Sequence, residues 1–224
     1  MELPQPAEPI ASSEPAVLHM LPPTHMDNAV CVQGDETFSA SASSFYSPNK
    51  ETPYKAFSTL ETSATTGADT NQWTSGAPSY ETGSFTGTYS CCHTVVDGNT
   101  VSGEWLQLQC TEKHMVDSFS IMANFWNPYR APRSFVFAGS DDGVTWSALH
   151  MEHGINRWTS KQIRTFSVSV KRAVHFYRLI VTSVHGTQSW LTIDKLRLYT
   201  KCEPLDPSPI PCEVAAHAIG VHDV

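Results

Sequence analysis

A succession of short, strand-like apolar runs between residues 103 and 199 most limits what this chain can fold into. The first run, Gly103–Cys110, alternates apolar and polar residues, which places Leu106, Leu108 and Cys110 on one face of a strand. Further runs follow at spacings of about 8–12 residues, and none has the 3.6-residue period of an amphipathic helix. The pattern predicts an all-β domain, a β-sandwich or jelly roll, in which Cys110 packs as a small core residue.

The later runs show where individual strands lie. Val116–Asn124 is the second β-like run, and Val174–Val181 is apolar on both faces, as in a central strand. Ser140–Gly143 is a hairpin-turn sequence whose Asp side chains we expect to accept hydrogen bonds from backbone amides. The alternation then slips by one residue near Asp194 and Lys195, which indicates a bulge.

Both ends of the chain are acidic and rich in proline. Six prolines fall within the first 23 residues and four within residues 201–224, and proline favours extended backbone over helix. Residues 1–110 carry a net charge of -10 and residues 201–224 carry -3, whereas residues 111–200 carry +5. We therefore predict extended arms over residues 1–36 and 201–224 around a sandwich over residues 37–200. The arms are either solvated or bound to basic surfaces of this domain or of a neighbour.

Composition excludes several classes of protein. The net charge of -8 argues against broad nucleic-acid binding. No apolar run approaches the roughly 18 residues of a membrane span, and the first residues lack the basic and apolar regions of a signal peptide. There is no Asn-x-Ser/Thr sequon. These features predict a protein that is intracellular or assembled into a particle such as a virion or a ciliary structure.

The six cysteines fit no zinc ribbon or zinc finger spacing. Cys91 and Cys92 are adjacent, and a bridge between neighbours is strained. Cys31 and Cys202 bracket the central region, so a disulfide between them would close it. The lack of a sequon and of a signal-peptide pattern instead favours reduced thiols, as in an intracellular protein.

One loop offers the residue types of a binding surface. Asn124–Pro132 joins two predicted strands and contains Trp126, Asn127, Tyr129 and Arg130. Aromatic rings stack on sugar faces, and Arg or Asn side chains hydrogen-bond to hydroxyl groups. The alternative is a loop whose aromatic rings only cover the end of the sandwich.

Two residues outside this loop are weaker candidates for ligand binding, Trp158 and His185. Trp190 begins a strand and is expected in the core. The sequence has no nucleophile elbow, P-loop or dinucleotide-binding glycine motif, so we expect no enzyme activity.

The order of several motifs resembles the coagulation factor V/VIII type C domain, also called the discoidin domain. The resemblance extends over about 145 residues and rests on five segments in order. These are Lys55–Phe57, Thr94–Gln107, Arg130–Trp146, Phe176–Val181 and Ile193–Tyr199. It implies an eight-stranded jelly-roll sandwich of the galactose-binding-like type, usually without enzyme activity, that binds glycans, lipid head groups or proteins through loops at one end.

Calcium is the one cofactor that the resemblance raises. In calcium-binding relatives an early loop and a late Glu supply oxygen ligands, and calcium takes six to eight of them. The early candidates in this chain are Asp69 and Asp97, but the late position holds Asp194 followed by Lys195, whose ammonium group opposes a cation. We therefore expect no cofactor, with calcium as the alternative.

Two functions remain open from the sequence. The first is a non-enzymatic structural component of a larger assembly, such as a virion minor capsid protein or a ciliary component, tied to protein neighbours by its arms. The second is a carbohydrate-binding lectin module displayed at a surface.

Overall fold

The computed structural model describes residues 18–201, apart from residues 24, 49, 61–70, 77 and 188. Leu18–Lys201 is one compact unit. Its strands are antiparallel, apart from one isolated parallel bridge, and form two layers that enclose an apolar core, so the predicted all-β sandwich is confirmed.

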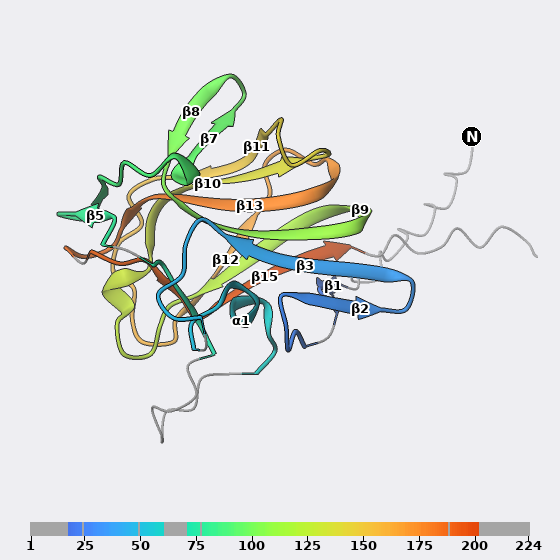
Figure 1. The fold of residues 1–224 in the computed structure, drawn as a ribbon, viewed down its shortest axis with the longest axis horizontal. Helices are drawn as coiled ribbons and strands as arrows, with labels where there is room; N and C mark the ends of the chain where they lie inside the picture. Colours follow the sequence, from blue (N-terminus) through green and yellow to red (C-terminus); the bar gives the residue numbers. More distant parts are fainter. Residues whose placement is uncertain are drawn as a thin grey trace, which may run out of the picture. The chain divides into compact units, whose positions relative to one another are not determined.

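The first layer contains the longest paired strands, which lie side by side in Figure 1. Its order is β2-β3-β9-β13-β10-β11, and the short hairpin β5–β6 joins it through β13. The bounds are β2 (Val30–Gln33), β3 (Glu36–Ala42), β5 (Tyr80–Glu81), β6 (Ser84–Phe85), β9 (Glu104–Met122), β10 (Pro132–Ser140), β11 (Ser147–Glu152) and β13 (Ala173–Val184).

The second layer has the order β1-β15-β9-β12. Two small sheets, β4–β14 and β7–β8, and three short helices complete the described structure. The bounds are β1 (Leu18–Leu21), β4 (Trp73–Thr74), β7 (His93–Val96), β8 (Asn99–Ser102), β12 (Ile163–Ser167), β14 (Thr192–Ile193), β15 (Lys195–Lys201), α1 (Pro53–Phe57), η1 (Ser90–Cys92) and η2 (Pro128–Arg130). None of the helices in the described part of the chain has the length and apolar character needed to cross a membrane.

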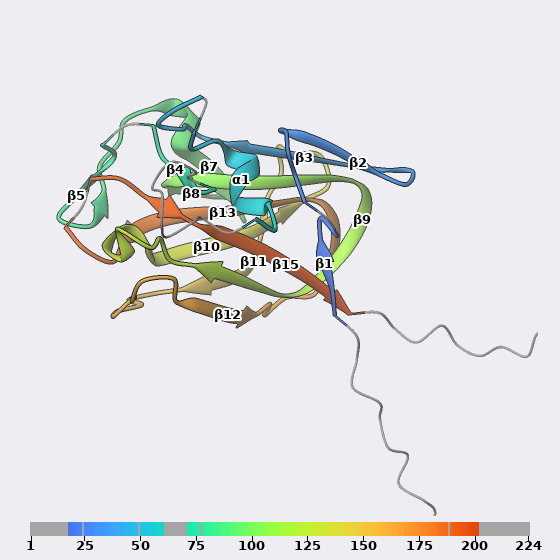
Figure 2. The ribbon, with the colours of Figure 1, turned by 90° about the horizontal axis from the view of Figure 1, so that it is seen from below.

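Strand β9 belongs to both layers. The sequence predicted two separate strands, over 103–110 and 116–124, but the chain stays extended through the polar segment 111–115. Its first half pairs with β3 and β13, and its second half pairs with β15 and β12. Figure 2 shows β9 turning at the right-hand end from one layer to the other.

The core is built from side chains that both layers direct inward. Phe119 on β9 stacks on Phe137 of β10 at 4.3 Å and on Phe166 of β12 at 5.2 Å between ring centroids. Cys110 is 1% exposed, as expected of a small core residue. The phase slip near Asp194 is a break between two strands and not the predicted bulge. Strand β14 ends at Ile193 and pairs with β4, whereas β15 begins at Lys195 and pairs with β9.

The predicted start of the sandwich at residue 37 is wrong. Residues 18–21 form β1, which pairs with β15, and β2 pairs with β3. Leu21 and Met26 are buried in the core. Proline content misled the prediction, because Pro22 and Pro23 follow an edge strand, where a missing backbone N–H group costs little. The remaining parts of the predicted arms, residues 1–17 and 202–224, lie outside the described residues.

The possible Cys31–Cys202 disulfide is not formed, since Cys31 is a free thiol in the structure. Its Sγ lies 3.8 Å from the His25 carbonyl oxygen and accepts a hydrogen bond from Gln33 Nε2 at 3.4 Å. Cys202 itself lies outside the described residues.

A buried carboxylate connects β9 to the loops at one end of the sandwich. Glu104 is fully buried, and its Oε1 accepts a hydrogen bond from Ser79 Oγ at 2.6 Å. Its Oε2 accepts hydrogen bonds from Ser44 Oγ at 2.8 Å and from Ser43 Oγ. Because a buried charge is tolerated only when its oxygens are satisfied, Glu104 holds these three serines, and with them two loops, in place.

We predict that Glu104→Ala lowers the free energy of unfolding by about 3 kcal/mol or more, because the buried hydroxyl group of Ser79 and the half-buried hydroxyl groups of Ser43 and Ser44 lose a charged acceptor. Urea denaturation measures the change. Glu81→Ala, which removes an exposed carboxylate from β5, is the matched control and should change stability by less than about 0.5 kcal/mol. Equal, small effects of the two substitutions would contradict this role of Glu104.

Candidate functional site

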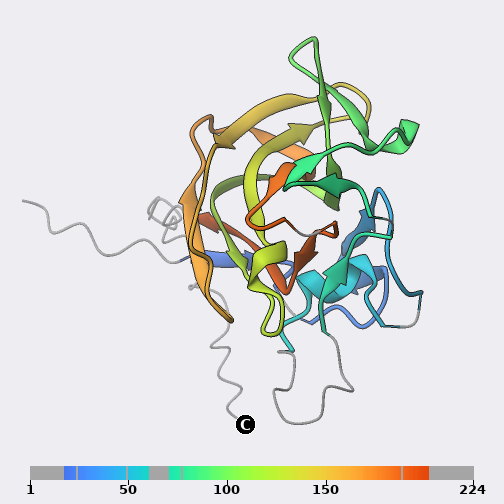
Figure 3. The same cartoon turned by 90° about the vertical axis from the view of Figure 1, so that its left-hand side faces the viewer.

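Loops from distant parts of the sequence meet at the end of the sandwich that Figure 3 faces. The segment after β3 bonds to β4, since Tyr46 N donates to Thr74 O at 2.9 Å. The loop between β9 and β10 bonds to the segment after β13, where Gly186 N donates to Tyr129 O at 2.7 Å. A Cβ atom on Gly186 would lie 2.8 Å from that of Tyr129, so this close approach requires glycine. Backbone hydrogen bonds thus join these loops in pairs at this end of the sandwich.

The loop between β9 and β10 is fixed from inside by Asn124. This buried side chain accepts hydrogen bonds from the backbone N–H groups of Trp126 at 3.0 Å and Asn127 at 2.8 Å. Its Nδ2 donates to Gln72 Oε1, and Pro128–Arg130 then forms the short helix η2. The sequence analysis identified the loop but missed Asn124 as the residue that shapes it.

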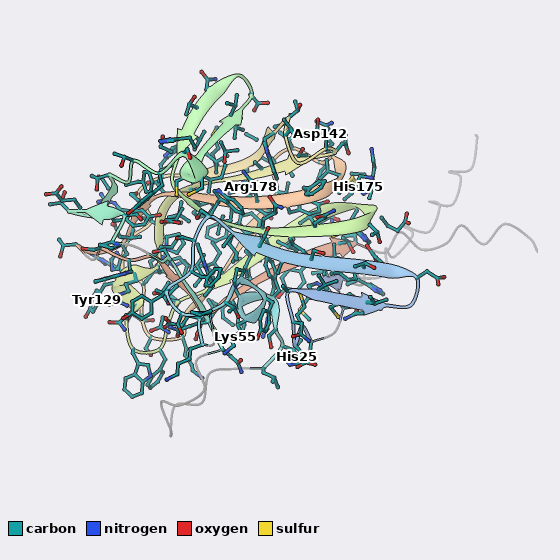
Figure 4. All side chains as sticks on the ribbon, viewed as in Figure 1. His25, Lys55, Tyr129, Asp142, His175 and Arg178 are labelled. Atoms are coloured by element: carbon teal, nitrogen blue, oxygen red, sulfur yellow. The ribbon has the colours of Figure 1, made fainter. Side chains whose placement is uncertain are left out.

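The predicted aromatic residues of this loop face solvent. Trp126 is 58% exposed and its ring meets that of Phe125 edge-on. Tyr129 is 56% exposed and stacks on the imidazole of His185, with 6.2 Å between ring centroids. Figure 4 labels Tyr129 at this end of the molecule. Asn127 is half-buried in the same turn.

His185 is half-buried beneath Tyr129. Burial, together with the positive charges of Arg164 and Arg133, holds the pKa of His185 below its ordinary value. The imidazole is therefore uncharged at neutral pH, which suits stacking against a phenol ring.

Trp158, which the sequence made a candidate for ligand binding, does not belong to this surface. Its side chain is 3% exposed, and its Nε1 donates to Pro132 O at 2.8 Å. The guanidinium group of Arg164 covers the ring at 4.6 Å from its centroid. Both its polar atom and its ring face are thus occupied within the protein.

A hollow of about 180 Å³ opens beside the loop and is lined by Tyr46, Glu51, Thr74, Arg130 and Trp190. The Arg130 guanidinium carbon lies 5.2 Å from the centroid of the Trp190 ring. Trp190 is therefore not the core residue that the sequence predicted. The other lining residues lie in the Ser/Thr-rich segment 37–90, where no sequence pattern distinguished Tyr46, Glu51 or Thr74.

Two of the residues that line this hollow each have a nitrogen atom without a partner. Among the described residues, Arg130 Nε and Trp190 Nε1 are shielded from solvent and make no hydrogen bond. By contrast, the indole groups of Trp73 and Trp105 donate to the carbonyl oxygens of Ser44 and Cys91. Unpaired buried donors are costly, so a ligand oxygen that accepts from them would be favoured.

The acceptors around the hollow are held by a polar network. Glu51 Oε1 accepts a hydrogen bond from Gln72 Nε2 at 2.8 Å, and the same nitrogen lies 3.3 Å from Thr74 Oγ1. Gln72 in turn accepts from Asn124. The hollow thus combines a carboxylate, a hydroxyl, a guanidinium and two aromatic rings in fixed positions.

No family model matches the chain, and no curated protein matches it. Among solved structures, an F5/8 type C domain from Bacteroides fragilis aligns with a TM-score of 0.50 at 12% identity, over 78% of this chain and 97% of that chain. The chain has the F5/8 type C fold. This galactose-binding-like fold confirms the resemblance seen in the sequence.

Two other solved structures are similar to this chain at a lower TM-score. The module CBM32-5 from Clostridium perfringens, in complex with GalNAc-β-1,3-galactose, has a TM-score of 0.49 at 11% identity, over 72% of this chain and 94% of that chain. A fucolectin from striped bass (Morone saxatilis) serum has a TM-score of 0.49 at 10% identity, over 75% of this chain and 46% of that chain.

The described residues do not fit the calcium ion that the resemblance raised. Asp97 lies in the β7–β8 turn, where its Oδ2 accepts a hydrogen bond from Ala148 N at 2.9 Å. Asp69 lies outside the described residues. Lys195 is 1% exposed, and its Nζ donates to the carbonyl oxygens of Lys55 at 3.0 Å and Asn71 at 2.6 Å. An ammonium group is thus the cation that these carbonyl oxygens bind.

We predict that calcium does not raise the melting temperature of this protein, because Lys195 already supplies the positive charge. Thermal melting in millimolar calcium and in chelator should give the same midpoint. Lys195→Met should lower the free energy of unfolding by roughly 1–3 kcal/mol, since two carbonyl oxygens of half-buried residues lose their donor. The control is Lys50→Met at an exposed lysine. A clear rise of the wild-type midpoint in calcium would contradict the assignment.

A second prediction separates the exposed tryptophan from the buried one. Trp158→Ala should cost roughly 3–5 kcal/mol of stability, the usual cost of deleting a buried large ring. Trp126→Ala should leave the melting temperature nearly unchanged, because 58% of the side chain is exposed. Paired denaturation curves test this, and a strongly destabilised Trp126→Ala variant would remove Trp126 from the binding surface.

Proposed function

We propose that this chain is a carbohydrate-binding module that holds a single sugar ring in the hollow beside Arg130 and Trp190. The observation that carries the proposal is the pair of unpartnered donors, Arg130 Nε and Trp190 Nε1, at one small hollow. A sugar presents both hydroxyl groups, which accept such hydrogen bonds, and a C–H face, which packs on an indole ring.

The size and charge of the hollow support a neutral sugar. Its volume of about 180 Å³ is below the roughly 300–1,000 Å³ of pockets for drug-sized ligands, so it suits one ring. Glu51 and Arg130 line it together, which disfavours a strongly charged ligand of either sign. Trp126 and Tyr129 extend the surface for further sugar residues.

The assembly role that the sequence suggested stays a prediction. It depends on the arms, whose residues 1–17 and 202–224 lie outside the described residues. Both functions are compatible in one protein, because sugar binding uses the loop end of the sandwich.

A glycan array followed by calorimetry tests the proposal. We expect the chain to bind a set of glycans that share one terminal sugar. Trp190→Ala and Arg130→Ala should each raise the dissociation constant about tenfold or more, a change of about 1.4 kcal/mol. Arg172→Ala, at an exposed arginine of the segment before β13, is the matched control and should leave binding unchanged. Absence of glycan binding, or binding that survives both hollow substitutions, would contradict the proposal.

A further inference from the structure

A second cluster of chemically active side chains lies where β9 turns from one layer to the other. Glu36 begins β3, while Cys110 and His114 lie on β9. One ligand atom from each of the three residues lies within 4.8 Å of the other two. In Figure 4, His175, which bonds to this segment, is labelled near the right-hand end of the sandwich, whereas Tyr129 lies near the left-hand end. The cluster is therefore separate from the sugar hollow.

An irregularity in β9 brings two of these residues together. In a regular strand, residues 110 and 114 would be about 13 Å apart. Here Gln109 pairs with Phe176 and His114 with Val174, so residues 110–113 lie opposite His175 alone. Strand irregularities of this kind re-aim side chains and are frequent beside functional sites. The irregularity in β9 brings Cys110 and His114 close together.

Hydrogen bonds hold the backbone on both sides of the irregularity. His175 Nδ1 lies 3.3 Å from the carbonyl oxygen of Cys110, and Tyr177 Oη donates to the carbonyl oxygen of His114. The ring of Phe38, which is paired with Cys110 across the strands, stacks on the His114 imidazole at 6.4 Å. Cys110 and His114 are thus positioned by residues that take no part in the cluster.

The donor atoms are those that zinc prefers. Zinc binds thiolate, imidazole and carboxylate groups, and tetrahedral coordination places such atoms about 3.3–3.5 Å apart. His114 Nε2 already lies 2.6 Å from Glu36 Oε1. Glu36 and His114 are partly exposed, with side-chain exposures of 19% and 23%, so they can rotate over the buried Cys110 sulfur.

We propose that Glu36, Cys110 and His114 form a zinc-binding site at the turn of β9, with the fourth position of the metal filled by water. As the zinc–sulfur bond forms, the thiol proton of Cys110 passes to solvent. The His114–Glu36 hydrogen bond opens, the proton of His114 Nε2 moves through solvent to Nδ1, and Nε2 and a Glu36 carboxylate oxygen bind the metal. Three protein ligands and one open position match the general pattern of accessible rather than purely structural zinc sites.

Cobalt titration of the reduced full-length chain tests the site, because a cobalt–thiolate bond produces a charge-transfer band in the near ultraviolet. We expect one equivalent of cobalt to produce this band and one equivalent of zinc to abolish it. Cys110→Ser should remove the band. Glu36→Gln and His114→Gln, at partly exposed positions, should each weaken cobalt binding about 100-fold or more. Losing a residue that only hydrogen-bonds to a metal ligand typically weakens metal binding about 10–100-fold, so a larger loss indicates direct ligation.

The controls separate this cluster from the other thiols and histidines. Cys91→Ser disrupts the vicinal pair, in which the Sγ atoms of Cys91 and Cys92 lie 3.5 Å apart, and should leave the band intact. His150→Gln removes another histidine–carboxylate pair and should also have no effect. The proposal is overturned if wild type shows no band, or if the band survives Cys110→Ser or is lost in Cys91→Ser.

Discussion

Strand β9 is the constraint on which the rest of the structure depends, because both layers of the sandwich pair with it. Its first half is hydrogen-bonded to β3 and β13, and its second half to β15 and β12. Glu104 at its start fixes the Ser43–Ser44 loop, and Asn124 just beyond its end shapes the loop of Trp126. The turn in its middle gathers the proposed zinc ligands. One strand thus positions both candidate sites.

Buried charges hold the loops around this strand. Glu104 is satisfied by serine hydroxyl groups, and Lys195 by backbone carbonyl oxygens. The guanidinium carbon of Arg178, labelled in Figure 4, lies 3.9 Å from the Trp105 ring centroid and 4.1 Å from that of Trp146. Burial lowers the pKa of Arg178 to about 10, so it remains charged at neutral pH. Each charge joins segments that are far apart in the sequence.

Much of the fold was predictable because the alternation of apolar and polar residues along a strand shows which of its faces is buried. The run that ends at Cys110 and the phase slip at Asp194 follow from local pattern alone. The bounds of the arms were harder to predict, because proline content indicates the local backbone conformation and not which strands pair. Leu18–Leu21 pairs with β15 despite the prolines that follow it. The continuity of β9 also escaped prediction, because its polar middle segment resembles a loop.

The candidate site was only partly predictable. Trp126 and Trp158 are both tryptophans in polar segments, and only tertiary contacts distinguish them. Trp158 packs in the core, reaches the Pro132 carbonyl oxygen and is covered by Arg164. Trp190 and Glu51 meet Arg130 through tertiary contacts that no local pattern encodes. The same holds for Glu36, Cys110 and His114, whose spacing fits no zinc motif until the irregularity of β9 is taken into account.

The most direct test of sugar binding is the indole N–H spectrum of the protein during titration with the glycan that it binds best. The chain has six tryptophans, so nitrogen-15 labelling yields six indole signals that report on separate places in the fold. Our account predicts a large shift of the Trp190 signal, a smaller shift of Trp126, and no change for the buried Trp73 and Trp158. A shift confined to Trp105 and Trp146, which flank Arg178, would place the ligand elsewhere and contradict the account.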